Sequence, residues 1–138
     1  MMRPTHGFTL IEFIAVLVVI SILAVAVIMN YPSAGSFNLI SISEQLKRDI
    51  RYTQTLAMSL NTSYTINISA TNYFISPTPP RGAVNVAMPA GVSLSGSSIT
   101  FDASGTPSNS STATITVTAT GEGSNALTVA PETGFVNG

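Results

Sequence analysis

The stretch Gly7-Phe8-Thr9-Leu10-Ile11-Glu12, with the apolar run that follows it, decides the structure of the N-terminal part of this chain. From Phe8 to Met29 the residues are apolar or small, except Thr9, Glu12 and Ser21. At ~1.5 Å per residue, a helix of this run is roughly 33 Å long, enough to cross a hydrocarbon core of about 30 Å. A buried helix in a small domain is not apolar on every face, so we predict a membrane helix over residues 8–30.

A secretory signal peptide is the alternative interpretation, because it too places a basic residue, here Arg3, before an apolar run. This run exceeds the usual apolar region of about 7–15 residues and contains a carboxylate. The polar leader, residues 1–7, also ends abruptly at a glycine. The small residues of Pro32–Gly35 resemble a cleavage site, so this alternative stays open.

Glu12 is the residue of the run that most needs an explanation. An ionisable group at membrane depth costs on the order of 3 kcal/mol and is usually paired, although a group near the interface can reach water. Cleavage between Gly7 and Phe8 would create a positively charged α-amino group. That amine cannot easily meet Glu12 in good geometry within one helix, but it can do so between two staggered helices. The pair therefore predicts a contact between two subunits.

The motif Gly7–Glu12 with its apolar run resembles the processing site of type IV prepilins and type II secretion pseudopilins. The resemblance implies that prepilin peptidase cuts after Gly7, that Phe8 is N-methylated, and that Glu12 guides docking onto a subunit already in the filament. One departure is that Met29 stands where family members often carry a proline, and the nearest proline is Pro32.

The same resemblance implies where the protein lies and what it meets. It implies a single-pass protein of the bacterial inner membrane, with a cytoplasmic leader and a periplasmic head, that enters a filament after processing. Its implied partners are prepilin peptidase, other pilin or pseudopilin subunits, an inner-membrane assembly platform and membrane lipid.

Helical periodicity resumes after Pro32, which lacks a backbone donor and weakens the helix locally. We predict an amphipathic continuation over residues 31–61, with one buried face: Ile42, Leu46, Ile50, Thr53, Ala57 and Leu60. Ser41–Glu44 fits a capping box, which permits a restart near Ser41, and Asn61 predicts the C-terminal stop. The other face is predicted to be solvated, with contact to adjacent subunits as the alternative: Glu44, Gln45, Lys47, Arg48, Asp49 and Arg51.

Residues 62–138 have the pattern of a β-rich periplasmic head. The predicted strands are Thr62–Ser69, Tyr73–Ser76, Val92–Leu94, Ile99–Phe101, Thr112–Thr120, Ala126–Ala130 and a last one at Gly134–Val136. Ser95–Ser98 is predicted to be a hairpin turn and Gly121–Asn125 a loop. A long helix followed only by strands predicts an α+β fold, in which an antiparallel sheet packs on the apolar face of the amphipathic helix.

The order of these elements resembles the H-type minor pseudopilins of type II secretion and related minor pilins. The helix of Glu44–Leu60 runs into a strand, and Ile99–Gly105 precedes a threonine-rich strand and a glycine-containing terminus. Phe101 and Gly105 are the two sharp landmarks, for which core packing and a turn are the structural explanations.

Composition excludes most catalytic and metal-binding chemistry. There is no cysteine, and the one histidine, His6, lies in the leader. The processed chain would therefore lack Ser-His-Asp and Cys-His sites and the usual zinc sites. Asp102, with Ser104 and Gly105, lacks the alternating ligands and closing glutamate of a calcium loop. We expect no enzyme, no metal and no cofactor.

Three functions stay open at this point. The first is a minor pilin or pseudopilin, which primes or caps the filament of a type IV pilus or a type II secretion pseudopilus. The second is the major repeating pilin of a fibre, and the third is a DNA-binding minor pilin used in DNA uptake. The H-type resemblance and the absence of a cysteine pair favour the first. A formal net charge of -1 and few basic residues argue against nucleic acid as a partner.

Overall fold

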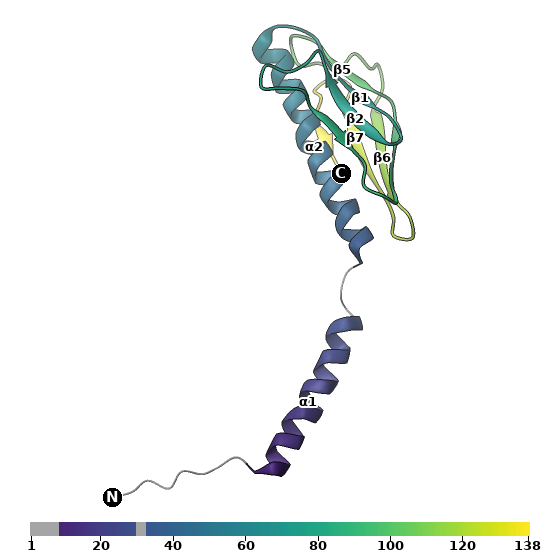
Figure 1. The fold of residues 1–138 in the computed structure, drawn as a ribbon. Helices are drawn as coiled ribbons and strands as arrows, with labels where there is room; N and C mark the ends of the chain where they lie inside the picture. The colour runs from purple at the N-terminus through teal and green to yellow at the C-terminus, as the bar shows by residue number, and fades with distance from the viewer. Residues whose placement is uncertain (1–8, 30–32) are drawn as a thin grey trace, which may run out of the picture. The chain divides into compact units, whose positions relative to one another are not determined.

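A computed structural model describes residues 9–29 and 33–138 of the chain (Figure 1). The predicted cleavage site, Gly7 and Phe8, lies outside the described residues. The chain divides into two units, Met1–Pro32 and Ser33–Gly138, and each is described by itself. We call the second of these, Ser33–Gly138, the globular unit.

The first unit contains helix α1, Leu10–Met29. Thr9 caps it, because the Thr9 hydroxyl oxygen accepts a hydrogen bond from the backbone N–H of Glu12 at 3.3 Å. No glycine or proline interrupts the segment. No helix among the described residues is both long enough and apolar enough to be counted as a membrane span.

The globular unit begins with helix α2, Ala34–Leu60. Ser33 caps it from an extended conformation, since its hydroxyl oxygen accepts the backbone N–H of Ser36 at 3.1 Å. The predicted restart of the helix near Ser41 is therefore wrong. Ser33 caps the free backbone N–H groups at the start of the helix, and Ser41 lies inside a continuous helix.

Helix α2 ends as the sequence predicts. Asn61 adopts a left-handed conformation (φ 48°, ψ 43°), and its N–H donates to the carbonyl of Ala57. Asparagine is one of the few residues that tolerates this conformation, which turns the chain out of the helix and into the first strand.

Within residues 33–138, eight strands form two four-stranded antiparallel sheets. The first sheet, in the order β3-β2-β1-β5, contains β1 (Tyr64–Ile68), β2 (Asn72–Ser76), β3 (Asn85–Ala87) and β5 (Ile99–Phe101). The second, in the order β4-β6-β7-β8, contains β4 (Val92–Gly96), β6 (Ala113–Ala119), β7 (Gly123–Val129) and β8 (Val136–Asn137). The predicted α+β class, a helix packed on antiparallel strands, is confirmed.

The hairpin predicted around Ser95–Ser98 is wrong. Strand β4 pairs with β6 in the second sheet, whereas β5 pairs with β1 in the first. Gly96, at a φ of 138°, brings its backbone so close to β6 that an added Cβ would lie 2.6 Å from the Thr114 carbonyl oxygen. The Ser98 hydroxyl oxygen then accepts the Ile68 N–H at 3.1 Å, which holds the chain against the first sheet. These contacts move the chain from one sheet to the other.

The hairpin of β6 and β7 is longer than predicted. Strand pairing continues to Ala119↔Gly123, so most of the loop predicted over Gly121–Asn125 belongs to β7. In β6 apolar residues alternate with threonines, with Ile115 and Val117 fully buried and the intervening threonines turned outward. This period of two is the expected pattern for a strand with one face in the core.

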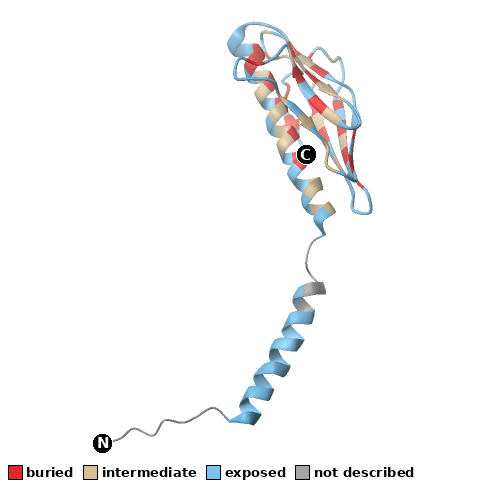
Figure 2. Cartoon of the chain, viewed as in Figure 1, coloured by how far each residue is buried: buried red, intermediate tan, exposed pale blue. Residues whose placement is uncertain are grey.

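The core of the globular unit lies between α2 and the two sheets (Figure 2). Five members of the predicted apolar face are buried: Ile42, Leu46, Ile50, Thr53 and Ala57. The sixth, Leu60, is exposed because it is the last residue of the helix, and Leu56 is buried instead. All the residues of this core come from Ser33–Gly138, so the globular unit has the core of an independently folding domain.

Candidate functional site

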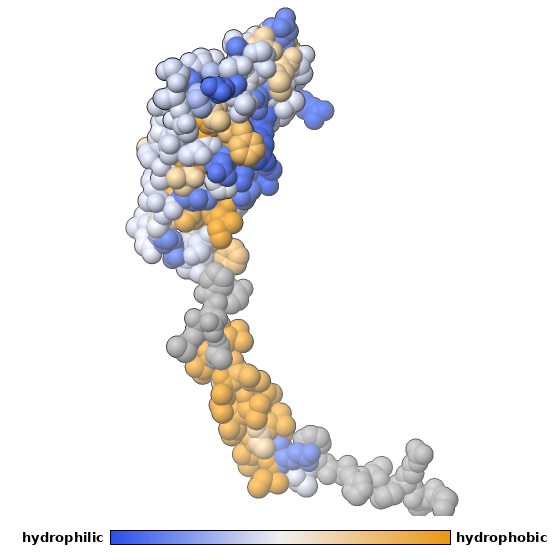
Figure 3. Space-filling view, turned by 180° about the vertical axis from the view of Figure 1, so that it is seen from behind, coloured by the Kyte–Doolittle hydropathy of each residue, from blue (hydrophilic) through white to orange (hydrophobic). Residues whose placement is uncertain are grey.

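Helix α1 exposes almost nothing but apolar surface. Its described side chains are all exposed, and Figure 3 shows its surface as nearly continuously hydrophobic. The hydroxyl of Ser21 donates to the carbonyl oxygen of Leu17 at 2.7 Å, so this polar group is satisfied within the helix. An apolar helix that buries no face of its own needs another apolar environment, either lipid or other helices.

Glu12 is the one ionisable side chain among residues 9–29. It lies in the first turn of α1, where the backbone dipole favours a negative charge. On the surface of the helix it borders a shallow apolar groove formed by Ala15, Val16, Val19 and Ile20. The structure therefore places the predicted assembly carboxylate at the end of an apolar stripe. It does not bring Glu12 together with the other predicted site residues, since Gly7 and Phe8 are not described.

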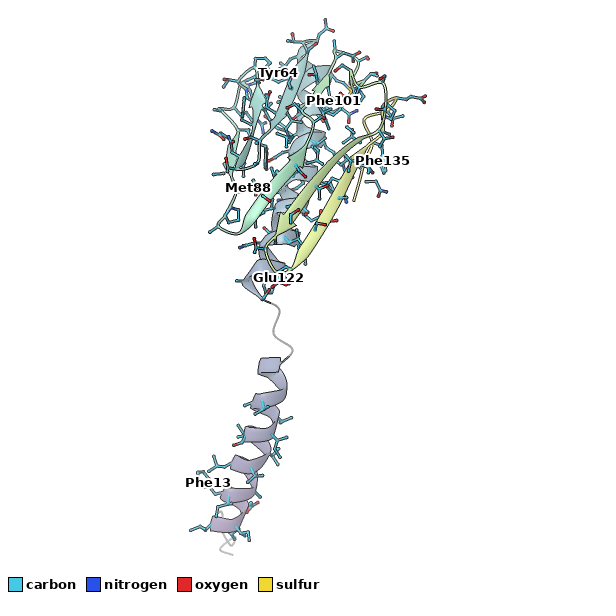
Figure 4. The ribbon with its side chains drawn as sticks, turned by 90° about the vertical axis from the view of Figure 1, so that its right-hand side faces the viewer. Phe13, Tyr64, Met88, Phe101, Glu122 and Phe135 are labelled. Atoms are coloured by element: carbon cyan, nitrogen blue, oxygen red, sulfur yellow. The ribbon has the colours of Figure 1, made fainter. Side chains whose placement is uncertain are left out.

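A polar contact at the start of α2 was not predicted from the sequence. Glu122, in the turn between β6 and β7, accepts hydrogen bonds from the hydroxyls of Ser33 and Ser36, the second at 2.7 Å. Figure 4 shows Glu122 at the tip of the β6–β7 hairpin, beside the first turn of α2. We call Ser33, Ser36 and Glu122 the serine clasp.

The serine clasp depends on a close approach of helix and hairpin. A Cβ added to Gly35 would lie 2.7 Å from Cγ of Glu122, so the glycine lets the Glu122 side chain lie this close to the helix. The hydroxyls of Ser33 and then Ser36 hold the pKa of Glu122 below its ordinary value of 4.5. The carboxylate also lies at a helix N-terminus, which favours its charged form. The clasp thus ties the hairpin tip to the first turn of the helix through a charged acceptor.

Acid should loosen the serine clasp. Because the pKa of Glu122 is lower in the folded state, its stabilising effect is complete above about pH 4.5 and is lost as the pH falls below that value. We expect the melting temperature of the wild-type globular unit to fall more steeply between pH 5 and 3 than that of Glu122→Gln, measured by circular dichroism. Glu132→Gln, which removes a carboxylate outside the clasp, is the matched control and should follow the wild type. Equal acid slopes for wild type and Glu122→Gln would contradict the clasp.

The C-terminal segment is attached to α2 by three side chains on successive turns. Lys47 donates to the carbonyl of Gly138 at 2.7 Å, Arg51 to that of Val136 at 3.2 Å, and Gln54 to that of Thr133 at 2.8 Å. We call this set of contacts the C-terminal seam. Gly134 fits beneath Gln54 at a φ of 66°, and an added Cβ would lie 2.5 Å from the Gln54 nitrogen. The seam therefore fixes a strand, β8, that is only two residues long.

The seam and one further contact correct the prediction of a solvated charged face on α2. Lys47 and Arg51 bind backbone carbonyls, and Asp49 accepts the hydroxyl of the fully buried Tyr73 at 2.6 Å. Burial, and then the hydrogen bond and charge of Asp49, raise the pKa of Tyr73. The charged residues of α2, which the sequence predicts to face solvent, thus partly form hydrogen bonds that attach the helix to the strands.

The loop after β5 is held together by hydrogen bonds to its own aspartate, Asp102. One carboxylate oxygen of Asp102 accepts the hydroxyl and N–H of Ser104 and the N–H of Thr106. These bonds, led by the Ser104 hydroxyl, lower the pKa of Asp102. Gly105 forms the predicted turn at a φ of 82° and receives a second hydrogen bond from Gln54. No group of three or more His, Cys, Asp or Glu side chains within the described ranges could hold a metal ion.

Comparisons with known proteins agree with both units. The prokaryotic N-terminal methylation motif matches residues 2–28. Two crystal forms of the type IV minor pilin FimU from Pseudomonas aeruginosa (strain PAO1) are similar to the chain at 18% identity. Their TM-scores are 0.58 and 0.61, covering 72% and 77% of this chain and 90% and 91% of theirs. Among curated protein sequences, none matches the chain.

The motif at residues 2–28 and the likeness of fold to a minor pilin together support a type IV prepilin-like protein. At 18% identity, the likeness to FimU is a likeness of fold. The more specific resemblance to H-type pseudopilins remains a prediction.

Proposed function

We propose that this chain is a minor pilin, a structural subunit that is processed by prepilin peptidase and assembled through its N-terminal helix. The observation that carries the proposal is α1 itself. An exposed apolar helix with one carboxylate in its first turn lies almost entirely within the matched methylation motif and precedes a pilin-like globular unit. Such a helix suits a protein that first rests in lipid and then packs among the N-terminal helices of other subunits.

The proposed pathway starts in the inner membrane. Residues 8–30 span the bilayer, the leader of residues 1–7 faces the cytoplasm, and the globular unit lies in the periplasm. Prepilin peptidase cuts between Gly7 and Phe8 and N-methylates Phe8, and an assembly platform transfers the subunit from lipid to the filament. There Glu12 meets the α-amino group of a neighbouring subunit.

Low copy number is favoured over a major subunit because the similar structures, two crystal forms of one protein, are those of a minor pilin by name. A minor pseudopilin of type II secretion, which the order of elements in the sequence resembles, stays the alternative system. A major repeating pilin is the second alternative, and a DNA-binding minor pilin is the third. The last is the least favoured, because only four basic residues lie in the globular unit and two of them, Lys47 and Arg51, already bind carbonyls.

The test is the composition of sheared filaments from the source organism. Mass spectrometry of that fraction should find the chain with N-methylated Phe8 at its terminus and at a few per cent or less of the major subunit, roughly as expected for a subunit that primes or caps a polymer. Replacing Gly7 with a bulky residue should leave the precursor uncut and absent from filaments. A different N-terminus would overturn the processing step, and equal abundance with the main subunit would favour the major-pilin alternative.

A further inference from the structure

A pocket of about 290 Å³ lies between the last turns of α2 and the loop that joins β2 to β3. It is lined by five helix residues and two loop residues: Tyr52, Thr55, Leu56, Ser59, Leu60, Pro80 and Arg81. Ligand pockets typically measure about 300–1,000 Å³, so this one has room for a single small ring. The serine clasp and the C-terminal seam involve none of its side chains, so the pocket has no part in the contacts described above.

Both walls of the pocket are held in place by the fold. The loop wall is the turn Pro79–Gly82, whose first residue is buried and whose ends are joined by a backbone hydrogen bond of 3.0 Å. Pro80 fixes the backbone at the second position of this turn, next to Arg81. On the helix wall, the ring of Tyr52 packs against the core. A preformed pocket loses little conformational entropy on binding, and this favours affinity for a small ligand.

The loop wall supplies a positive charge. Arg81 is exposed, and its side chain forms no hydrogen bond or ion pair with any residue that the structure describes. Among the described residues, no carboxylate lines the pocket, and the nearest one along α2, Asp49, already accepts the Tyr73 hydroxyl at 2.6 Å. A guanidinium binds a carboxylate through two parallel hydrogen bonds. The loop wall therefore favours a ligand that carries a carboxylate.

The helix wall supplies hydrogen-bond acceptors. The hydroxyl of Thr55 donates to the Arg51 carbonyl at 2.9 Å, and that of Ser59 donates to the Leu56 carbonyl at 3.2 Å. A hydroxyl has one proton, so each oxygen is left with its acceptor capacity alone. A ligand group beside these oxygens must donate a hydrogen bond, which a carboxylate or phosphodiester oxygen cannot do. The helix wall therefore favours ligand hydroxyls.

We propose that this pocket binds one ring of an acidic saccharide, a uronic acid. The carboxylate binds Arg81, and ring hydroxyls donate to Thr55 and Ser59. The apolar C–H face of the ring packs on Tyr52, whose side chain has an apolar face and a polar tip. A DNA strand fits less well, because its sugars have no free hydroxyl to donate. This site goes beyond the proposed function, since a major or a minor subunit could carry it.

A titration followed by nuclear magnetic resonance tests the proposal on the globular unit, residues 33–138. The probe is the trimer of galacturonic acid, and the control probe is its methyl ester, which has the same rings and free ring hydroxyls without the charge. We expect the backbone amide signals of the pocket residues to shift on addition of the acid. The ester should bind at least about tenfold more weakly, because it lacks the charge-assisted hydrogen bonds.

Substitutions then separate the pocket from general attraction of charge. Arg81→Gln should weaken binding by about tenfold or more, and Arg81→Lys by less, since it keeps the charge and loses the paired geometry. Arg51→Gln is the matched control, because it removes the same charge from the side of α2 that binds the Val136 carbonyl. It should change the affinity by less than about twofold. The spectra of all variants should keep the dispersion of the folded wild type.

Each other outcome overturns the proposal. If the pocket signals do not shift at about 10 mM trimer, which would reveal even weak binding, the site is wrong. Equal affinity for the acid and the ester, or equal losses for Arg81→Gln and Arg51→Gln, also contradicts it. A single-stranded oligonucleotide that binds this pocket more tightly than the trimer favours the DNA-binding alternative instead. The minor-pilin function is tested separately by the composition of sheared filaments, so either can fail alone.

Discussion

Glu12→Ala is expected to remove the subunit from filaments without affecting its production or the folding of its globular unit. In the proposed assembly, the carboxylate pairs with the α-amino group of a neighbour inside an apolar helix bundle. Removing one partner of a buried pair costs about 3–5 kcal/mol, because the other charge is left uncompensated. At about 1.4 kcal/mol per factor of ten, incorporation should fall by roughly 100-fold or more. Quantitative immunoblots of sheared filaments and of membranes measure both pools.

Ser21→Ala is the matched control in the same helix. Its hydroxyl is bound to the carbonyl of Leu17 within α1, so its removal leaves no charge unpaired. This variant should enter filaments like the wild type. If Glu12→Ala subunits are incorporated at the level of Ser21→Ala, the pairing between subunits is wrong.

Phe101→Ala should be the most damaging single change in the globular unit. Phe101 is fully buried on β5, and its ring lies 2.9 Å from the position that a Cβ on Gly134 would occupy. Truncating a buried phenylalanine to alanine costs about 3–5 kcal/mol, a large part of the roughly 5–15 kcal/mol that stabilises a typical domain. Urea unfolding of residues 33–138, followed by circular dichroism, should show this loss as a lower midpoint with an unchanged slope.

Phe135→Ala is the control for Phe101→Ala, because it makes the same chemical change at an exposed position. The unfolding free energy of this variant should stay within about 0.5 kcal/mol of the wild type. Similar losses for the two variants would mean that Phe135 contributes to the core.

Elements determined by local chemistry could be predicted from the sequence. The apolar periodicity of α2, the left-handed stop at Asn61 and the alternation in β6 all depend on residues close together in the chain. The landmarks Phe101 and Gly105 also have their expected roles, one in the core and one in a turn. Local patterns therefore identify the α+β class and most of its strands.

Pairing between distant segments could not be predicted. Strands β4 and β5 are adjacent in sequence and look like a hairpin, yet they belong to different sheets. The deciding contact is the close approach of Gly96 to β6, and nothing near Gly96 in the sequence indicates that partner. Strand β3 has three residues and follows a proline-rich loop, so its own pattern is too short to indicate a strand.

The candidate sites also differ in whether a local pattern or a contact between distant segments defines them. Glu12 is conspicuous because a carboxylate within an apolar run is unusual whatever the rest of the chain does. The serine clasp joins residues 89 and 86 positions apart, and each of its members is ordinary in its own segment. The C-terminal seam is equally hidden, because its acceptors are backbone carbonyls, which every sequence has.

Because its acceptors are backbone carbonyls, the C-terminal seam places few constraints on the sequence of the last strand. Lys47, Arg51 and Gln54 donate hydrogen bonds to the main chain, so these bonds do not depend on most of the side chains in the last strand. Gly134, under Gln54, and the buried Val136 are the positions that the fold constrains. Substitutions at position 135 can therefore accumulate without unfolding the protein. The surface chemistry at this position can therefore vary while the fold of the globular unit is kept.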